Sequence, residues 1–421
     1  MREFHVGDNA TITGKQFKYT GTVMPSSDNN ILVLKLDNGY NVGIMKDQID
    51  RTTLVHPTKV TRAPIAKIKS KIGLPNVTII STGGTITSKV DYKTGAVHPL
   101  TKPEELINNI PELSKLANLK MLAPFSKLSE DMMPEDWQKI AEIAAIEMNK
   151  GAEGVVVTHG TDTLHFTAAA LSFMIKDLSK PIAVVGGQRS SDRGSFDGAQ
   201  NLICAVRYCL SNIAEVSVVM HANSDDDYCY AMRGTKVRKL HSSRRDAFRP
   251  INCLPLATID PKKGVNVISK DFNKRTNKKV KLDNRCEPKV ALIKYSPGLD
   301  PNILDYYISK DYKGVVIEGT GFGHVATTNW IEQVNRASEH MIVCMTTQTI
   351  YGTTNNHIYS AGVNLYKAGV VYCKDTLPET AYVKLMILLG QNKNIEGVRR
   401  MMAQNLVGEI NERIEKKSFL F

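Results

Sequence analysis

Short apolar runs separated by polar turn residues make up the first fifty residues of the chain. The runs lie at residues 10–12, 19–23, 31–36 and 40–44. Asp37-Asn38-Gly39, which precedes the last run, is a typical turn sequence, and closely spaced runs of this kind favour short β-strands. A small barrel is an arrangement in which such strands have no long exposed edges. We therefore predict a small β-barrel over residues 1–50.

From Asn76 onward the pattern changes to apolar, β-rich runs that end in Gly- or Thr-rich turns and lead into helical stretches. Such runs lie at residues 77–80, 154–157 and 182–185. Near-continuous Val and Ile runs that alternate with helices are typical of a parallel sheet covered on both faces. The polar loops after these strands are expected at the carboxyl edge of the sheet, where doubly wound folds bind ligands.

Two polar stretches divide the chain into domains. Residues 51–75 are interrupted by Pro57, Pro64 and Pro75, which favours a linker. A basic stretch from 261 to 285 precedes a second set of α/β runs that opens at residue 289. The predicted organisation is a linker at 51–75, a first α/β domain at 76–262, a connection at 263–288 and a second α/β domain at 289–421.

Charge and cysteine content narrow the class of protein. The chain has 54 Lys and Arg against 42 Asp and Glu, and the resulting net charge of +12 suits either a polyanion or acidic partner, or an unspecific solvated surface. Seven cysteines without a Cys-x-x-Cys pair predict reduced thiols and give no zinc-site spacing. No apolar run approaches the ~20 residues of a membrane span, and the first residues lack a signal-peptide pattern. We expect a cytoplasmic protein that has no membrane contact.

The first candidate site follows a predicted strand directly, at Thr82-Gly83-Gly84-Thr85. Glycines let a backbone approach a substrate and expose N–H groups that can stabilise an oxyanion. A threonine hydroxyl at such a turn can act as a nucleophile when a base removes its proton. A tight turn or a phosphate loop is the alternative, although the glycine spacings of nucleotide-binding loops are absent here.

Thr158-His159-Gly160-Thr161-Asp162-Thr163 supplies a second hydroxyl and a carboxylate just before a helical run. The N–H groups at a helix start can bind a substrate carboxylate, and Asp162 can pair with an ammonium group. The alternative is that Asp162 or Thr163 only caps the helix.

Residues 233–243 are densely basic. They form either a solvated or RNA-facing stripe, or they supply one desolvated lysine that acts as the base for a threonine hydroxyl. Spacing alone leaves open which lysine this is.

The order and surroundings of residues 82–86, 158–163 and 180–186 resemble those of bacterial-type L-asparaginases, from about Asn76 to the C-terminus. This resemblance implies two asparaginase-like α/β domains and two nucleophile–base pairs. The corresponding catalytic residues are Thr85, Tyr92, Thr161, Asp162 and Lys239. It favours Thr85 as the attacking residue, with Tyr92 beside it, and the Thr161 set as an aid to proton transfer or deacylation.

The same resemblance assigns the remaining site residues. Lys239 matches better than Lys236 because Asp246-Ala247-Phe248 follows it at the family's spacing. Ser129 and Glu130 match the loop that contacts the α-carboxylate and amine of the substrate, although many asparaginases have glutamine where Glu130 stands. Gly84 and Gly160 are also expected to line the substrate site.

The added N-terminal β-domain departs from free-standing asparaginases and resembles the D-type subunits of archaeal glutamyl-tRNA(Gln) amidotransferases. That resemblance implies glutamine hydrolysis in this chain without a cofactor of its own. The released ammonia would serve a kinase-type, tRNA-binding partner of the E type, which uses ATP and Mg²⁺ to convert Glu-tRNA(Gln) to Gln-tRNA(Gln). It further implies a homodimer of this chain within a heterotetramer, with tRNA(Gln) bound mainly through the partner.

Two other functions remain open from the sequence. A cytosolic L-asparaginase that works alone would carry the β-domain as an unrelated appendage. An RNA-binding protein would use the barrel and the basic segments to hold RNA. Aromatic residues do not interleave with the basic runs as they do on a base-stacking platform, which disfavours RNA binding.

Overall fold

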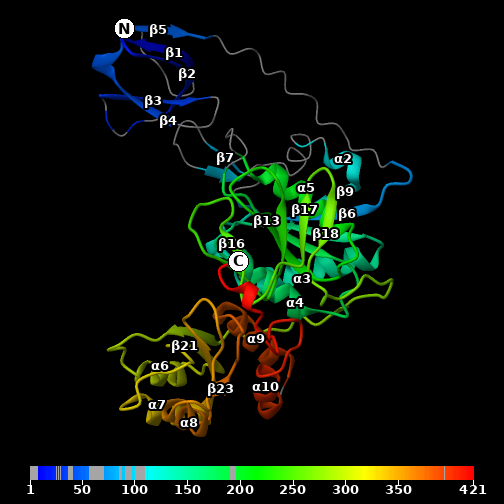
Figure 1. The fold of residues 1–421 in the computed structure, drawn as a ribbon, viewed down its shortest axis with the longest axis vertical. Helices are drawn as coiled ribbons and strands as arrows, with labels where there is room; N and C mark the ends of the chain where they lie inside the picture. The colour runs from blue at the N-terminus through cyan, green and yellow to red at the C-terminus, as the bar shows by residue number, and fades with distance from the viewer. Residues whose placement is uncertain are drawn as a thin grey trace.

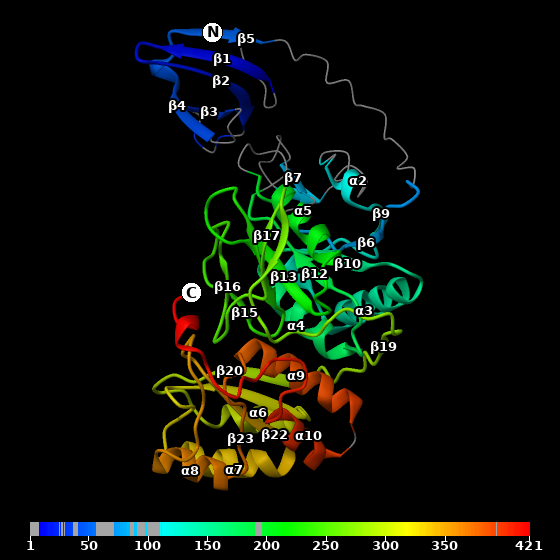
Figure 2. The same ribbon diagram turned by 45° about the vertical axis from the view of Figure 1, so that its right-hand side comes forward.

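The computed structural model describes residues 8–24, 26, 28, 30–36, 41–55, 71–84, 88–90, 97–99, 110, 112–189, 196–392 and 394–421. In both views an N-terminal sheet lies apart from the two α/β domains that make up the rest of the described chain (Figures 1 and 2). This arrangement confirms the predicted fold class, a small β-rich domain followed by an asparaginase-like pair of α/β domains.

The N-terminal domain is a five-stranded antiparallel sheet with the order β4-β3-β2-β1-β5. Its strands are β1 (Asn9–Gly14), β2 (Phe17–Met24), β3 (Ile31–Leu36), β4 (Asn41–Met45) and β5 (Arg51–Leu54). Alternate residues of β1 are buried, as expected of a strand with one face on a core, and Ala10 and Ile12 lie in a small apolar cluster of this sheet. This core is separate from those of the α/β domains.

Two features of this sheet differ from the predicted barrel and linker. Arg51–Leu54 pairs with β1, so the sheet extends into the stretch assigned to the linker. Its two threonines favour a strand. Because exposed positions alternate along it, the segment contains no apolar run that would have predicted the strand. Among the described strands, β4 and β5 are the sheet edges and do not pair with each other, so the sheet is open there.

The first α/β domain is built on an eight-stranded sheet with the order β18-β17-β14-β13-β12-β10-β6-β9. Its strands are β6 (Asn76–Ser81), β9 (Asn118–Leu122), β10 (Gly154–Thr158), β12 (Ile182–Val185), β13 (Val216–His221), β14 (Cys229–Arg233), β17 (Ala257–Asp260) and β18 (Gly264–Val267). The three predicted Val/Ile runs are the adjacent parallel strands β6, β10 and β12. Every residue of β10 is buried, so the sheet is covered on both faces there.

Helices and small ribbons complete this domain. They are α2 (Leu113–Leu116), α3 (Pro134–Asn149), α4 (Leu164–Met174), α5 (Gly198–Cys209), β7 (Ser88–Val90) with β8 (Val97–Pro99), β11 (Ile175–Lys176) with β19 (Lys281–Leu282), and β15 (Val237–Lys239) with β16 (Phe248–Pro250). The predicted connection at 263–288 is partly sheet, because β18 pairs with β17 through a hairpin that turns at Gly264 with φ +104°. This edge strand was not predicted because it lies in the lysine-rich stretch 261–285, which has no apolar run.

The second α/β domain has a four-stranded parallel sheet with the order β20-β21-β22-β23. Its elements are β20 (Val290–Lys294), β21 (Gly314–Gly319), β22 (Ile342–Thr347), β23 (Val371–Tyr372), α6 (Ile303–Ser309), α7 (Trp330–His340), α8 (Ser360–Lys367), α9 (Pro378–Gln391) and α10 (Ile395–Met402). Helix α9 packs on its own sheet and also on α4 of the first domain. Apolar residues of α9 therefore lie in one continuous core with the first domain.

Within the described residues, no helix combines the length and the apolar character that crossing a membrane requires.

We expect the N-terminal sheet to unfold independently of the α/β domains, because its apolar core is its own. Ile12→Ala deletes a fully buried side chain and should destabilise this sheet by about 2–5 kcal/mol. Thr13→Ala on the same strand, at a partly exposed position, is the matched control. Hydrogen exchange resolved by segment should show faster exchange in β1–β5 alone. Equal acceleration in β6, β10 and β12 would contradict the independence of the two cores.

Candidate active site

The loops after β6 and β10 touch at the carboxyl ends of these neighbouring strands. The backbone N–H of Thr82 donates to the carbonyl oxygen of Thr158 at 3.1 Å, and its hydroxyl donates to the same oxygen at 2.9 Å. Gly84 has φ +84°, and a Cβ there would lie 2.4 Å from the backbone nitrogen of Gly160. Only a residue without a side chain permits this approach and this backbone conformation.

A third loop joins them from the short 3-10 helix Ser129–Asp131. A Cβ on Gly160 would lie 2.8 Å from the Cβ of Ser129, and the hydroxyl of Thr163 donates to the Ser129 carbonyl oxygen at 2.5 Å. The Ser129 hydroxyl donates to the Glu130 carboxylate at 3.2 Å. The structure thus places four predicted substrate-binding residues in adjoining loops, namely Gly84, Ser129, Glu130 and Gly160.

Lys239 brings the second predicted catalytic set together. Its ammonium group donates to the Thr161 hydroxyl oxygen at 2.8 Å and to an Asp162 carboxylate oxygen at 2.8 Å. The Lys239 side chain is 9% exposed, whereas that of Asp162 is 67% exposed. This contact places the Lys239 side chain within proton-transfer distance of the Thr161 hydroxyl, while the exposed Asp162 can also meet a substrate ammonium group.

Helix capping does not account for Asp162 or Thr163. Helix α4 begins at Leu164, and Thr163 at its cap position makes no side-chain cap bond. The Thr163 hydroxyl is used on the carbonyl of Ser129 instead, and Asp162 is used on Lys239. The two side chains therefore organise the site rather than the helix.

The structure separates the two candidate lysines. Burial lowers the pKa of Lys236, but its ammonium group pairs with Asp375, 2.5 Å away, and does not reach a threonine hydroxyl. Lys239 is the lysine that contacts Thr161. Desolvation alone would favour Lys236 as the base, whereas the hydrogen bond to a threonine hydroxyl favours Lys239.

His159, within the same loop, has a structural role. Its Nδ1 lies 2.7 Å from the Gly160 carbonyl oxygen, which can only accept, so Nδ1 carries the proton. Its Nε2 therefore accepts from the Thr167 hydroxyl at 2.8 Å. Complete burial lowers the pKa of His159 to about 4, so the ring is neutral near pH 7. A neutral ring with both nitrogens engaged fixes the Gly160 peptide and is not available as a base.

Thr85 and Tyr92, the first predicted nucleophile pair, lie outside the described residues. The loop that leads to Thr85 is described as far as Gly84. The structure adds Gln188, which the sequence did not single out, in the loop after β12. Its Oε1 lies 3.5 Å from the Thr161 hydroxyl, and its backbone N–H is held by the Asp197 carboxylate at 3.0 Å. In the sequence, the position of Gln188 in the loop after the third predicted parallel strand could have marked it as a candidate site residue.

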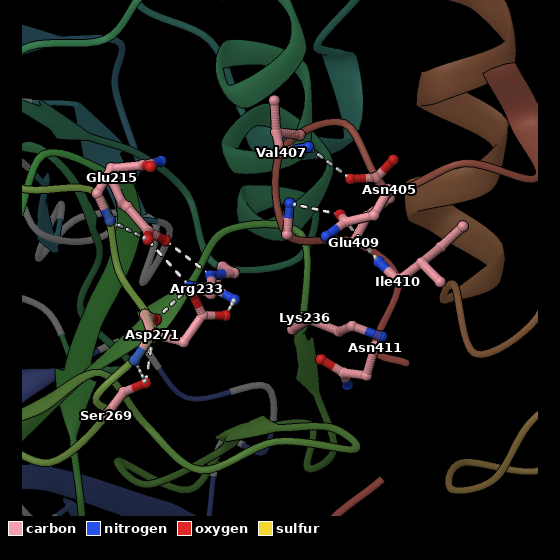
Figure 3. Close-up of polar contacts among 12 residues, drawn as sticks. Glu215, Arg233, Lys236, Ser269, Asp271, Asn405, Val407, Glu409, Ile410 and Asn411 are labelled. Carbon is pink, nitrogen blue, oxygen red and sulfur yellow. Dashed lines mark hydrogen bonds and ion pairs between the residues drawn. The ribbon is translucent and has the colours of Figure 1, made fainter. Parts of the chain in front are cut away.

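Four cations of the basic stretch at 233–243 are engaged in contacts within the protein, whereas residues 240–243 are exposed. Arg233 pairs with Glu215 at 2.7 Å, as Figure 3 shows, and Arg238 pairs with Glu379 at 2.8 Å. Lys236 and Lys239 are engaged as described above. The structure thus gives each of these four cations a carboxylate partner within the protein, which disfavours the RNA-facing alternative for them. Among the residues that the structure describes, no cluster of His, Cys, Asp and Glu is arranged to hold a metal ion.

Comparison with known proteins defines the class. Residues 76–272 match the asparaginase N-terminal domain model, and residues 289–402 match the glutaminase/asparaginase C-terminal domain model. The fold is similar to that of the thermostable L-asparaginase from Thermococcus kodakarensis, with a TM-score of 0.72 and 29% identity over 80% of this chain and 100% of that one. L-asparaginase I from Vibrio cholerae gives a TM-score of 0.69 and 29% identity over 80% and 99% of the two chains. The two α/β domains are those of an asparaginase-type amidohydrolase.

The N-terminal sheet and the full-length relatives define the family more closely. Residues 4–55 match the GatD N-terminal domain model. The D-type subunit of glutamyl-tRNA(Gln) amidotransferase from Pyrococcus abyssi is 51% identical over 97% of this chain and 95% of its own length. Its counterpart from Methanosarcina mazei is 45% identical over 97% and 99%. This chain belongs to the GatD family, the D-type subunits of glutamyl-tRNA(Gln) amidotransferases.

We expect Lys239→Ala to lower amide hydrolysis by about 10²–10⁴-fold, the usual contribution of a positioned acid or base, while leaving the fold intact. Lys263→Ala, at a side chain that is 88% exposed, is the control and should retain full activity. Steady-state hydrolysis and the circular dichroism of both variants provide the measurement. Substantial hydrolysis by folded Lys239→Ala would show that Lys239 is not required for the reaction.

A second prediction concerns the contact between the glycine loops. Gly84→Ala and Gly73→Ala both place a side chain at positive φ, +84° and +90°, at a cost of about 1–2 kcal/mol each. A Cβ at Gly73 meets nothing within 4 Å, whereas one at Gly84 runs into the Gly160 backbone. Gly84→Ala should therefore lose about 100-fold in activity through misplaced loops. Gly73→Ala should keep its activity, and equal losses would contradict the close approach.

Proposed function

We propose that this chain is the glutamine-hydrolysing component of a tRNA-dependent amidotransferase. The observation that carries this proposal is the Thr161–Lys239–Asp162 set, found in a chain that is similar to GatD proteins over nearly its full length. In this role the product that matters is ammonia. It amidates glutamate attached to tRNA(Gln) on a partner protein.

The proposed reaction has two covalent steps. A threonine hydroxyl, which the family resemblance assigns to Thr85 beside Tyr92, attacks the side-chain carboxamide carbon of glutamine. Backbone N–H groups of the glycine loops stabilise the resulting oxyanion. Collapse of this intermediate breaks the C–N bond and releases ammonia, and water then hydrolyses the acyl-enzyme to glutamate.

The second set supports these steps. Lys239, in contact with Thr161, carries the proton between the attacking hydroxyl, the leaving nitrogen and the incoming water. Asp162 holds Lys239 in place and, with its exposed carboxylate, meets the α-ammonium group of the substrate. The loop at Ser129 and Glu130 lies against Gly160 and contacts the α-carboxylate and amine of the substrate.

The partner in this proposal is a kinase-type protein of the E type that binds the tRNA and uses ATP and Mg²⁺. Ammonia in open water at neutral pH is mostly protonated and then is not a nucleophile. A closed path from this site to the partner prevents that loss. We further propose a homodimer of this chain within a heterotetramer in the cytoplasm, with tRNA(Gln) bound mainly by the E-type partner.

A free-standing L-asparaginase is the second candidate, supported by the likeness of both α/β domains to solved asparaginases. Glutamine and asparagine differ by one methylene, which a pocket discriminates by about 1–3 kcal/mol. Substrate preference alone therefore separates the two functions weakly. Transfer of the amide nitrogen separates them sharply.

We expect the purified chain, mixed with an E-type partner, ATP, Mg²⁺ and Glu-tRNA(Gln), to transfer the labelled amide nitrogen of glutamine into Gln-tRNA(Gln). Lys239→Ala should abolish transfer from glutamine, while externally added ammonia should still support amidation. Fast, partner-independent asparagine hydrolysis without transfer would favour the free-standing asparaginase and overturn the proposal.

A further inference from the structure

The strand that carries Lys239 is held in an unusual way. Strand β15 pairs with β16 in a two-stranded ribbon that is separate from the eight-stranded sheet. The backbone hydrogen bonds of the large sheet therefore do not fix β15 directly. Side-chain contacts around the ribbon hold it instead.

The first anchor is a buried ion pair that crosses between the two α/β domains. The Lys236 ammonium lies 2.5 Å from an Asp375 carboxylate oxygen and 2.9 Å from the Asp375 carbonyl oxygen. Both side chains are almost completely buried, at 0% and 1% exposure. Removing one member of such a pair leaves an uncompensated charge in the interior, so Lys236 is strongly tied to its position.

The C-terminal segment completes this anchor. Asn411 donates its backbone N–H and its side-chain amide to the Asp375 carboxylate, at 3.0 and 2.9 Å. The same amide donates to the carbonyl oxygen of Asn252, which follows β16, at 2.9 Å. In Figure 3 the Lys236 side chain extends toward Asn411 and the segment that follows Glu409. Both strands of the ribbon are thus bound, at the end where Lys236 and Asn252 lie, by residues of the C-terminal half.

The second anchor is next to Lys239 itself. Arg238 pairs with Glu379, in the first turn of α9, at 2.8 Å, and the Thr380 hydroxyl donates to the Thr235 carbonyl oxygen at 3.1 Å. Successive side chains of a strand point to opposite sides. Arg238 therefore reaches toward the second domain while Lys239 reaches toward Thr161 and Asp162.

From this arrangement we propose that the second domain positions Lys239 through Asp375 and Glu379, which hold β15 by Lys236 and Arg238. Lys236 and Arg238 are positioning residues, since neither contacts Thr161. The identity of the reaction that Lys239 serves rests on the proposed function. The proposal that the second domain positions Lys239 rests on the ion pairs of Asp375 with Lys236 and of Glu379 with Arg238.

The test compares two charge-neutralising variants with a matched control. Asp375→Asn and Glu379→Gln each remove a charge that holds β15. Glu147→Gln is the control, because Glu147, whose side chain is 8% exposed, pairs with Lys120 at 2.7 Å within the first domain. Its other partner is the Thr78 hydroxyl in β6, so this ion pair involves a buried carboxylate but does not hold β15. Measurements use the full chain in complex with its partner.

Asp375→Asn and Glu379→Gln should lower kcat for amide hydrolysis by about 10–100-fold, the effect of a misplaced catalytic group, with little change in KM. The Glu379 pair is less buried, so Glu379→Gln keeps the test valid if Asp375→Asn fails to fold. Glu147→Gln should reduce stability while leaving kcat unchanged. Arg238→Lys, which keeps the charge, should recover most of the activity that Arg238→Ala loses.

Two results would overturn the proposal. One is a loss of kcat in Glu147→Gln equal to that in Asp375→Asn, which would mean that the Lys236–Asp375 pair only stabilises the fold. The other is a crystal structure of Glu379→Gln or Asp375→Asn in which Lys239 keeps its hydrogen bonds to Thr161 and Asp162. The structural measurement needs no activity, so it separates failure of this link from failure of the proposed amidohydrolase function. Displacement of Lys239 in both variants supports the link.

Discussion

The hydrogen bond from Lys239 to Thr161 is the interaction on which the rest of the site depends. It requires that a lysine on a two-stranded ribbon meet a threonine that follows a strand of the large sheet, 78 positions earlier in the chain. Asp162 stabilises this contact by pairing with Lys239. On the other side of the strand, Lys236 and Arg238 form ion pairs with the second domain. The charge on Lys239 thus sits between one carboxylate in the site and two carboxylates behind its strand.

The parallel sheet supplies the other half of the geometry. Adjacent β6 and β10 end at the same edge, so the loops that follow them must meet, and glycines at 84 and 160 let their backbones come into contact. Helix α9 extends the same apolar core into the second domain, which gives the anchoring carboxylate of Glu379 a rigid base. Helix α9, which joins the two apolar cores, therefore also carries the carboxylate that pairs with Arg238 on β15, the strand of Lys239.

The sequence predicted much of this because the relevant signals are local. Val and Ile runs identified β6, β10 and β12, and the resemblance of the threonine motifs to those of asparaginases assigned Thr161, Asp162 and Lys239. The edge strands β5 and β18 were hidden because polar or lysine-rich segments carry no apolar run. Asp375 and Glu379 could not be found from sequence, because their partners lie about 140 positions away and no spacing rule connects them. The contact of Lys236 with Asp375 is likewise visible only in the structure.

One covalent step is central to the proposed reaction, the acylation of a threonine of this site by glutamine. Trapping the acyl-enzyme by rapid acid quench and locating it by peptide mass tests that step most directly. We expect a glutamyl group on Thr85 in the native chain, with accumulation in a variant whose deacylation is slowed. An acyl group on Thr161 would reverse the roles of the two threonines, and a chain that turns over glutamine without any acylated threonine would contradict the mechanism.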